Sequence, residues 1–142
     1  MAITPSVVFC AAQLKDTGIH TIIQYITIST QSEKCVKPSE AKAIAAAVLK
    51  LSLVFEIWGG SKDFSRGDIN ADGGERHGLF ASDWTAEVGA PDGTIIWFAI
   101  DNDVNEDQFV RFVRPYFAAV KRAWRANIAL AFAAAVSHVS NV

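Results

Sequence analysis

Runs of apolar, β-branched residues alternate along this chain with segments whose apolar residues recur at helical spacing. Residues 19–27 predict a first strand, which follows a short helix over residues 9–17. Residues 51–56 and 94–100 predict two further strands. The nearly continuous apolar character of residues 51–56 is typical of a parallel sheet that is covered on both faces.

Helices are predicted between these strands. One is expected to begin at Ser39, a natural N-cap, and to continue to about residue 49. Two more are expected, over residues 68–88 and from Asn105 to about residue 124. Pro115 lies inside the last one and predicts a kink or a local break. The alternation of strand and helix indicates right-handed βαβ units and a parallel sheet.

The composition fits a packed α/β domain and excludes several classes of protein. The chain has 142 residues, of which 51% are hydrophobic and 20% charged, and its net charge of -2 argues against a nucleic-acid binder. Its longest apolar run, residues 128–136, is too short to span a membrane. The N-terminus lacks the basic start of a secretory signal, so a cytoplasmic location is the default expectation.

The cysteines and histidines do not predict a metal or cofactor site. Cys10 and Cys35 form no CxxC motif, and both are expected to be reduced, partly buried thiols. His20, His77 and His138 are scattered, and His77, on a helix face, is expected to be structural or exposed. No glycine-rich nucleotide-binding motif is present. We therefore expect no metal and no cofactor.

Acidic residues follow two of the predicted strands. Glu56 ends one strand, and Asp101 and Asp103 follow another. Reactive groups in parallel α/β folds gather at the carboxyl ends of the strands, and neighbouring strands lie about 4.8 Å apart. Glu56 and Asp101 could therefore share one pocket. Paired carboxylates are what glycoside hydrolysis requires, with one as acid and the other as nucleophile or base.

The neighbours of these acids refine the expectation and leave alternatives open. Phe55 and Trp58 would provide an apolar setting that raises the pKa of Glu56. Asp103 is equally well explained as a cap of the following helix. Trp58, beside two glycines, is a candidate platform for a sugar ring, whereas Trp97 lies within a strand and is expected in the core.

Four segments together carry a resemblance to a known family. They are Ile22-Ile23-Gln24-Tyr25, residues 34–41, Leu53-Val54-Phe55-Glu56 and residues 96–103. Over residues 7–124 the chain resembles a bacterial family of glycoside-hydrolase-like domains, formerly of unknown function, within the glycosidase TIM-barrel superfamily. The resemblance implies a (β/α)₈-type barrel and a cell-wall or other polysaccharide ligand. On matching positions it nominates Glu56, Asp101 and Asp103 as an acidic pocket, with Tyr25 nearby.

The chain departs from the family pattern at two places. Gln24 stands where members usually have an arginine, and residues 3–6 stand where members commonly have a short strand that ends in an aspartate. The missing acid favours a binding module or an inactive module over an enzyme. The sequence therefore leaves two functions open, paired-carboxylate hydrolysis of a glycosidic bond in peptidoglycan or another polysaccharide, and non-catalytic glycan binding by a degenerate domain.

The length predicts an incomplete barrel. A complete barrel of this class needs about 250 residues, so residues 1–124 are expected to form about half of one. Residues 125–142 are expected to form an alanine-rich helical tail. A frameshift near Arg125 is an alternative, because residues 126–132 can be encoded by bases that give Gly-Glu-Tyr-Arg-Val-Gly-Val when read one base earlier. The unpaired sheet edge of a partial barrel predicts self-association.

Overall fold

The fold is a four-stranded parallel α/β sheet in the part of the chain that the structure describes. The structure, a computed structural model, describes residues 5–57, 64 and 67–136. The elements in chain order are α1 (Pro5–Asp16), β1 (Thr21–Ile26), α2 (Pro38–Ala46), β2 (Lys50–Ile57), α3 (Ala71–Glu87), β3 (Ile95–Val104), α4 (Glu106–Gln108), the π-helical segment η2 (Phe109–Val113), α5 (Arg114–Ala123) and β4 (Ala129–Val136).

The strands follow one another across the sheet in chain order, β1-β2-β3-β4, and every neighbouring pair is parallel. The register places Tyr25 opposite Val54, Val54 opposite Trp97, and Trp97 opposite Ala131. This arrangement confirms the predicted α/β fold, a partial TIM-barrel-like domain with about half the strands of a full barrel.

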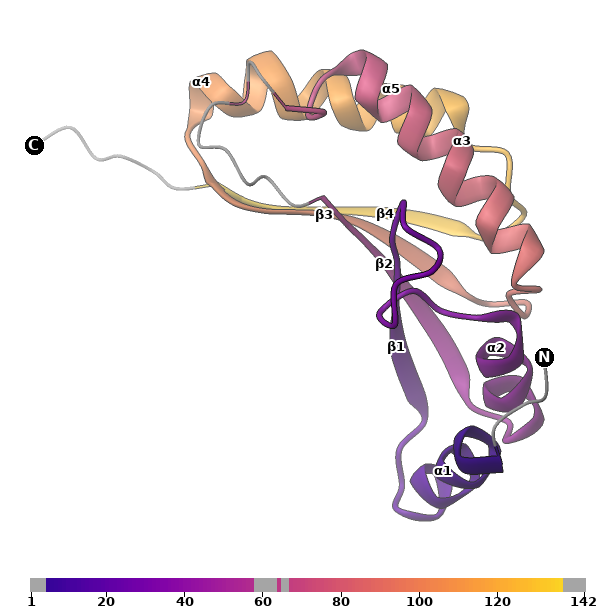
Figure 1. The fold of residues 1–142 in the computed structure, drawn as a ribbon. Coiled ribbons are helices and arrows are strands. Elements are labelled where there is room, and N and C mark those ends of the chain that lie inside the picture. The colour runs from indigo at the N-terminus through magenta and orange to yellow at the C-terminus, as the bar shows by residue number, and fades with distance from the viewer. Residues whose placement is uncertain (1–4, 58–63, 65–66, 137–142) are drawn as a thin grey trace, which may run out of the picture.

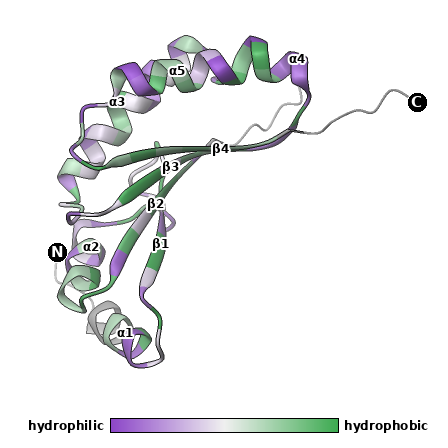
Figure 2. Ribbon diagram, turned by 180° about the vertical axis from the view of Figure 1, so that it is seen from behind, coloured by the Kyte–Doolittle hydropathy of each residue, from purple (hydrophilic) through white to green (hydrophobic). Residues whose placement is uncertain are grey.

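The helices cover one face of the sheet, and the curved opposite face carries no helix among the described residues (Figure 1). The hydrophobic core lies between the two layers, and includes the buried side chains of Leu53, Phe55, Ile96 and Phe98. The strands are the most hydrophobic elements in Figure 2. The expectation that both faces are covered is wrong, because the second face of a partial barrel borders an interior that further strands would close. We call it the open face.

Local chemistry explains where the helices begin. At α2 the Lys37 backbone N–H donates to the Glu40 carboxylate over 2.7 Å, and Pro38 occupies the first turn, where its missing N–H costs nothing. The helix therefore begins before Ser39, and the expected Ser39 cap is wrong. At α3 the Asn70 side chain accepts from the Gly73 N–H over 2.9 Å.

The long helix expected from Asn105 is interrupted, as Pro115 predicted. Its first turn is α4, a π-helical segment follows, and α5 begins at Arg114. The Arg114 N–H donates to the Phe109 carbonyl, five residues back. The widened turn comes directly before Pro115, which has no N–H to donate.

The expectation of a helical tail is wrong for residues 129–136, which form β4. This strand pairs in parallel with β3, and Phe132 packs against Phe98 and Phe117, with ring centroids 6.4 and 4.6 Å away. Just before the strand, the Trp124 indole N–H donates to the Ile128 carbonyl. Pairing and aromatic packing outweigh the helix propensity of alanine here. The frameshift stays a prediction, which the coding DNA tests.

Candidate functional site

A concavity of about 450 Å³ lies on the open face, toward the carboxyl ends of β2 and β3. Its lining comes from all four strands, and consists of Tyr25, Val54, Glu56, Ala99, Ile100, Asp101, Ala133, Ala134 and Ala135. We call it the acidic pocket. In parallel α/β folds this end of the sheet is where ligands bind.

Three of the side chains singled out in the sequence come together at the acidic pocket. Tyr25 enters from β1, Glu56 from β2 and Asp101 from β3. Glu56 is paired with Ala99, so Asp101 lies one strand across and two residues further along. This offset separates the two backbone positions by about 8 Å, given strand spacing and rise per residue. Both carboxylates are exposed to solvent.

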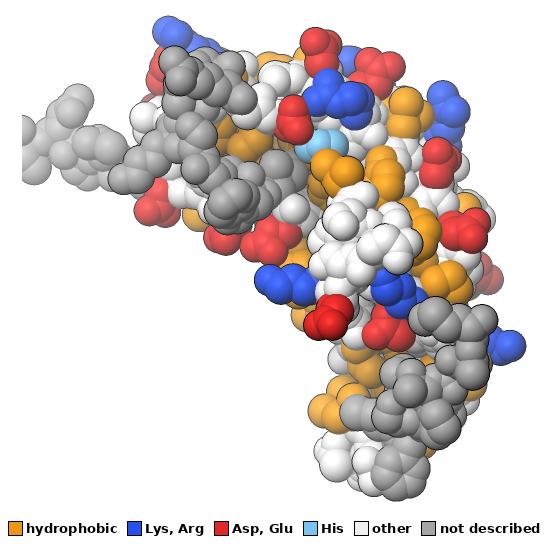
Figure 3. All heavy atoms as spheres, in the orientation of Figure 1, with side chains coloured by type: hydrophobic (Ala, Val, Ile, Leu, Met, Phe, Trp, Pro, Cys, Tyr) orange, Lys and Arg blue, Asp and Glu red, His pale blue; other side chains and the backbone are white. Residues whose placement is uncertain are grey.

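The other two nominated residues lie elsewhere. Asp103 is exposed near the end of β3 and is not part of the pocket lining. The cap of the next helix is Asn105, whose side chain accepts from the Gln108 N–H over 2.9 Å. Trp58 lies outside the described residues. Several acidic side chains gather at the end of the sheet next to α4 (Figure 3).

The expectation that Phe55 provides an apolar setting for Glu56 is wrong. Successive side chains of a strand point to opposite faces. Phe55 therefore lies on the helix-covered face, buried at 1% exposure and stacked on Phe98 with ring centroids 5.0 Å apart. Glu56 lies on the open face, away from that ring.

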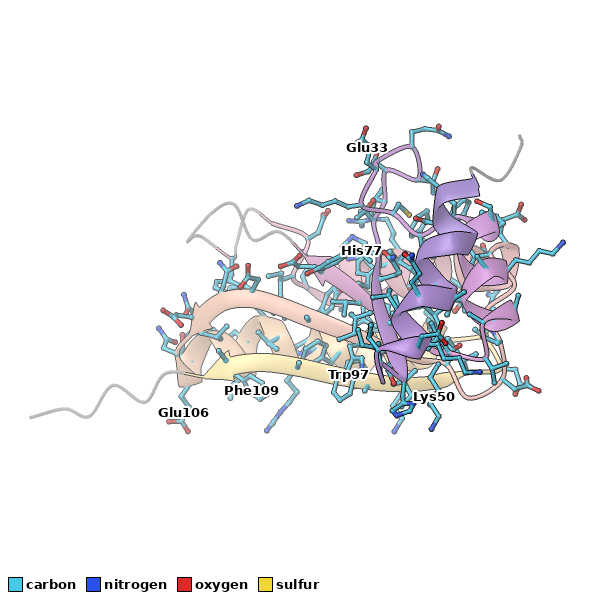
Figure 4. The ribbon with its side chains drawn as sticks, turned by 90° about the horizontal axis from the view of Figure 1, so that it is seen from below. Glu33, Lys50, His77, Trp97, Glu106 and Phe109 are labelled. Carbon is cyan, nitrogen blue, oxygen red and sulfur yellow. The ribbon has the colours of Figure 1, made fainter. Side chains whose placement is uncertain are left out.

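Trp97 is a candidate ligand-binding residue that the sequence analysis placed in the core. Its side chain is 39% exposed, and its register partner on β2 is Val54, which lines the acidic pocket. Figure 4 shows Trp97 between Lys50, at the start of β2, and Glu106, just beyond the end of β3. The alternation within residues 95–101 places Trp97 and Asp101 on one face, so the sequence linked Trp97 to the face of Asp101 without showing which face the helices cover.

His77 is structural, as expected. It lies on α3 at 4% exposure, and its Nδ1 is 3.0 Å from the Tyr116 hydroxyl of α5. Burial lowers the pKa of His77, while the nearby Asp68 carboxylate acts in the opposite direction. Burial also raises the pKa of Tyr116. The pair belongs to the contact between the helices and is not part of the acidic pocket.

Other features of the described residues do not add a site. Residues 5–57, 64 and 67–136 contain no cluster of three or more His, Cys, Asp or Glu side chains that could hold a metal ion. Within the same ranges no helix has the length and apolar character to cross a membrane. Cys35 is a free thiol and fully buried.

Comparison with known proteins agrees with this geometry. The model of a protein family described as Rv2525c-like, glycoside hydrolase-like domain matches residues 12–136. The match includes β4, so the fourth strand is part of the domain.

Individual relatives are distant and longer. The chain is 24% identical over 112 residues to the uncharacterized protein FadG of Bacillus subtilis strain 168, and covers 19% of that protein. Crystal structures of the Mycobacterium tuberculosis Tat-secreted protein Rv2525c, one with L-tartrate and one with HEPES, match with TM-scores of 0.66 and 0.65 at 21% identity. Each match covers 84% of this chain and 61% of that chain. The chain thus spans less than two thirds of these relatives, and the structural likeness establishes the fold.

Proposed function

The chain belongs to the family of Rv2525c-like, glycoside hydrolase-like domains, and from this membership we propose that its acidic pocket binds a glycan of the bacterial cell wall or another polysaccharide. One observation carries the proposal, namely that Tyr25, Glu56 and Asp101 line a single concavity at the carboxyl ends of the strands. Carboxylates accept hydrogen bonds from sugar hydroxyls, and an aromatic ring covers the apolar face of a sugar.

We propose a paired-carboxylate reaction if the domain is catalytic. Glu56 acts as the general acid that protonates the glycosidic oxygen, and Asp101 acts as its partner carboxylate. Asp101 then either attacks the anomeric carbon or activates a water, depending on whether the carboxyl groups come within about 5.5 Å or stay about 6.5–9.5 Å apart. The backbone offset of about 8 Å is compatible with both, because each side chain can lean along the strand. Asp103, which lies outside the pocket lining, adds negative charge near the end of β3.

A second candidate function is non-catalytic glycan binding at the same pocket. The pocket lining favours it, because carboxylates that accept hydrogen bonds and an aromatic ring hold a sugar whether or not a bond is cleaved. The position where the family commonly has an acid falls in residues 3–6, which contain none. In this role the carboxylates and Tyr25 hold the sugar, and bond cleavage does not follow.

Reducing-sugar release from peptidoglycan and chitin separates the two functions. The proteins compared are the wild-type chain, Glu56→Gln, and a matched control, Glu87→Gln, whose side chain is exposed on the helical layer. An enzyme loses at least a hundredfold of its rate in Glu56→Gln only. Equal background release of reducing sugar by all three proteins contradicts the proposal that Glu56 is catalytic.

Pull-down on insoluble peptidoglycan and chitin tests the binding itself. The double variant Glu56→Gln, Asp101→Asn is expected to lose retention, while Glu87→Gln keeps it. Retention that is absent in the wild-type chain, or unchanged in the double variant, contradicts the acidic pocket as a glycan site.

A further inference from the structure

Charge is distributed unevenly along this chain. Residues 108–142 contain no Asp or Glu, and they contain five of the 13 Lys and Arg residues. All 15 acidic residues therefore lie in residues 1–107, together with the other eight basic residues. The net charge of -2 is the result of -7 over the first range and +5 over the second.

The fold places the five cations of residues 108–142 on the solvent side of the helical layer. The side of α5 that packs on the domain is buried and uncharged. Arg114 and Lys121 are seven residues apart, which puts them on the same side of the helix. All five cations are exposed, and we call them the basic face: Arg111 in η2, Arg114, Lys121 and Arg122 in α5, and Arg125 just after it.

Most of the basic face has no counter-charge close by. Arg111 forms an ion pair with Asp107 over 2.9 Å. In the part of the chain that the structure describes, the other four cations have no carboxylate within ion-pair distance. Cations that are held near one another without counter-charges produce a positive potential, which attracts an anion.

A hollow of about 160 Å³ lies at one end of the basic face, between α3 and α5, which run side by side in the helical layer (Figure 1). Its lining consists of Glu75, Leu79, Ala119, Arg122, Ala123 and Arg125. The Arg125 N–H donates to the hydroxyl of the buried Ser82 over 3.0 Å, which fixes the backbone of Arg125 beside α3. The hollow thus has two arginines in its lining, and one of them is anchored to the neighbouring helix.

We propose that the basic face and this hollow bind a soluble polyanion that carries phosphate groups along its chain. Four of the five cations are arginines, whose planar guanidinium groups donate two parallel hydrogen bonds to a phosphate. The 14 residues from Arg111 to Arg125 extend over about 20 Å of helix. A polymer with repeated phosphates contacts this length, whereas a single small anion occupies only the hollow.

Other anionic partners fit the basic face less well. A basic helix that binds a membrane surface inserts its apolar side into the lipid, but Tyr116 and Val120 on the apolar side of α5 are 0% exposed. Proteins that bind single-stranded nucleic acids stack the bases on aromatic side chains, and the basic face includes no aromatic residue. Recognition by charge and phosphate geometry alone therefore favours a polyanion without bases.

The basic face is separate from the acidic pocket. The helices cover one face of the sheet, and the acidic pocket lies on the open face (Figure 1). Variants can therefore disable either site alone. The inference goes beyond the proposed glycan site, and it stands whether or not the acidic pocket binds a glycan.

Isothermal titration calorimetry of the full chain with poly(glycerol phosphate), at low ionic strength, tests the proposal. The double variant Arg114→Gln, Arg122→Gln is expected to weaken binding at least tenfold, because two phosphate contacts are lost. The matched control is Lys42→Gln, Lys50→Gln, which removes the same charge at exposed positions of α2 and β2. It is expected to weaken binding less than threefold, and unchanged urea midpoints show that both variants fold.

Glu75 provides a test of the hollow in which binding increases. Its carboxylate lines the hollow together with Arg122 and Arg125, and it repels an anion there. Glu75→Gln is expected to strengthen binding about threefold. Glu87→Gln removes the same charge at an exposed position of the same helix, outside the hollow, and is expected to leave binding unchanged. Equal affinities of these two variants contradict a role for the hollow.

Competing ligands identify the occupant. A single-stranded DNA oligonucleotide and vesicles that contain phosphatidylglycerol are titrated under the same conditions, and poly(glycerol phosphate) is expected to bind more tightly than either. The acidic-pocket variant Glu56→Gln, Asp101→Asn is expected to keep its affinity for the polymer, which separates this inference from the proposed glycan site. Three results overturn the proposal: no binding by the wild-type chain, wild-type affinity in Arg114→Gln, Arg122→Gln, and tighter binding of the DNA or the vesicles.

Discussion

At the scale of single residues, burial of His77 makes stability depend on pH. Its Nδ1 lies 3.0 Å from the Tyr116 hydroxyl, and its ring lies against Phe55 with centroids 5.2 Å apart. Burial lowers the pKa of His77 below its ordinary 6.5, with Asp68 opposing and Arg76 reinforcing the shift. The unfolded chain therefore binds a proton at this residue more readily than the folded chain does.

The folded state is accordingly expected to lose stability as the pH falls below 6.5 toward the lower pKa of folded His77. Above 6.5 the contribution is fully present. Urea unfolding at pH 7.5 and pH 5.5 measures it, and His77→Gln is expected to show a smaller drop between the two than wild type. His20→Gln, at an exposed position, should keep the wild-type drop. An equal drop in all three proteins contradicts the assignment.

The acids of the candidate site were predictable, whereas their surroundings were not. Glu56 and Asp101 follow apolar strand residues, and the parallel alternation of strands is enough to bring them to one edge. The expectations for Trp97 and Phe55 were wrong, because a strand residue is buried or exposed according to which face of the sheet the helices cover. That choice depends on the whole sheet, and the local pattern around one tryptophan does not contain it.

At the scale of elements, two glycines set how closely α3 approaches α5. A Cβ on Gly74 would lie 2.3 Å from the Tyr116 carbonyl oxygen, and one on Gly78 would lie 3.0 Å from the Val120 carbonyl oxygen. Both carbonyl oxygens belong to the backbone of α5, so they cannot move away by a change of side-chain rotamer. This close contact is what holds Tyr116 against His77.

Gly74→Ala is expected to destabilise the protein by about 1–3 kcal/mol, because the two helices must separate. Alanine is the better helix former by about 1 kcal/mol, so the sign of the effect distinguishes packing from propensity. The urea midpoint measures it. Gly67→Ala is the control, since a Cβ there meets no atom within 4 Å. A Gly74→Ala midpoint at or above the wild-type value contradicts the close contact.

Element identity was predictable wherever local signals agreed. Pro115 and the β-branched run of β1 each indicated the observed structure, because chain geometry and side-chain shape act locally there. The local signals in β4 instead predicted the wrong element, a helix. Its alanines favour a helix in isolation, and only the pairing with β3 and the contacts of Phe132 make it a strand. Long-range pairing of this kind is not encoded in residues 125–142 alone.

At the scale of the whole molecule, the sheet has a stable centre and less protected outer strands. β2 and β3 have hydrogen-bonded neighbours on both sides and carry the buried residues Leu53, Phe55, Ile96 and Phe98. Among the described residues, β4 is paired on one side only, and the outer side of β1 carries a short bridge between Tyr25 and Cys35. Protection of the backbone amides from solvent should therefore decrease from the central strands to the outer edge of β4.

Hydrogen exchange measured by mass spectrometry tests this gradient. The outward amides of β4 are expected to exchange faster than the amides of β2 and β3, because those two strands have hydrogen-bonded neighbours on both sides. Exchange in β4 that is as slow as in the central strands would show that its outer edge is covered.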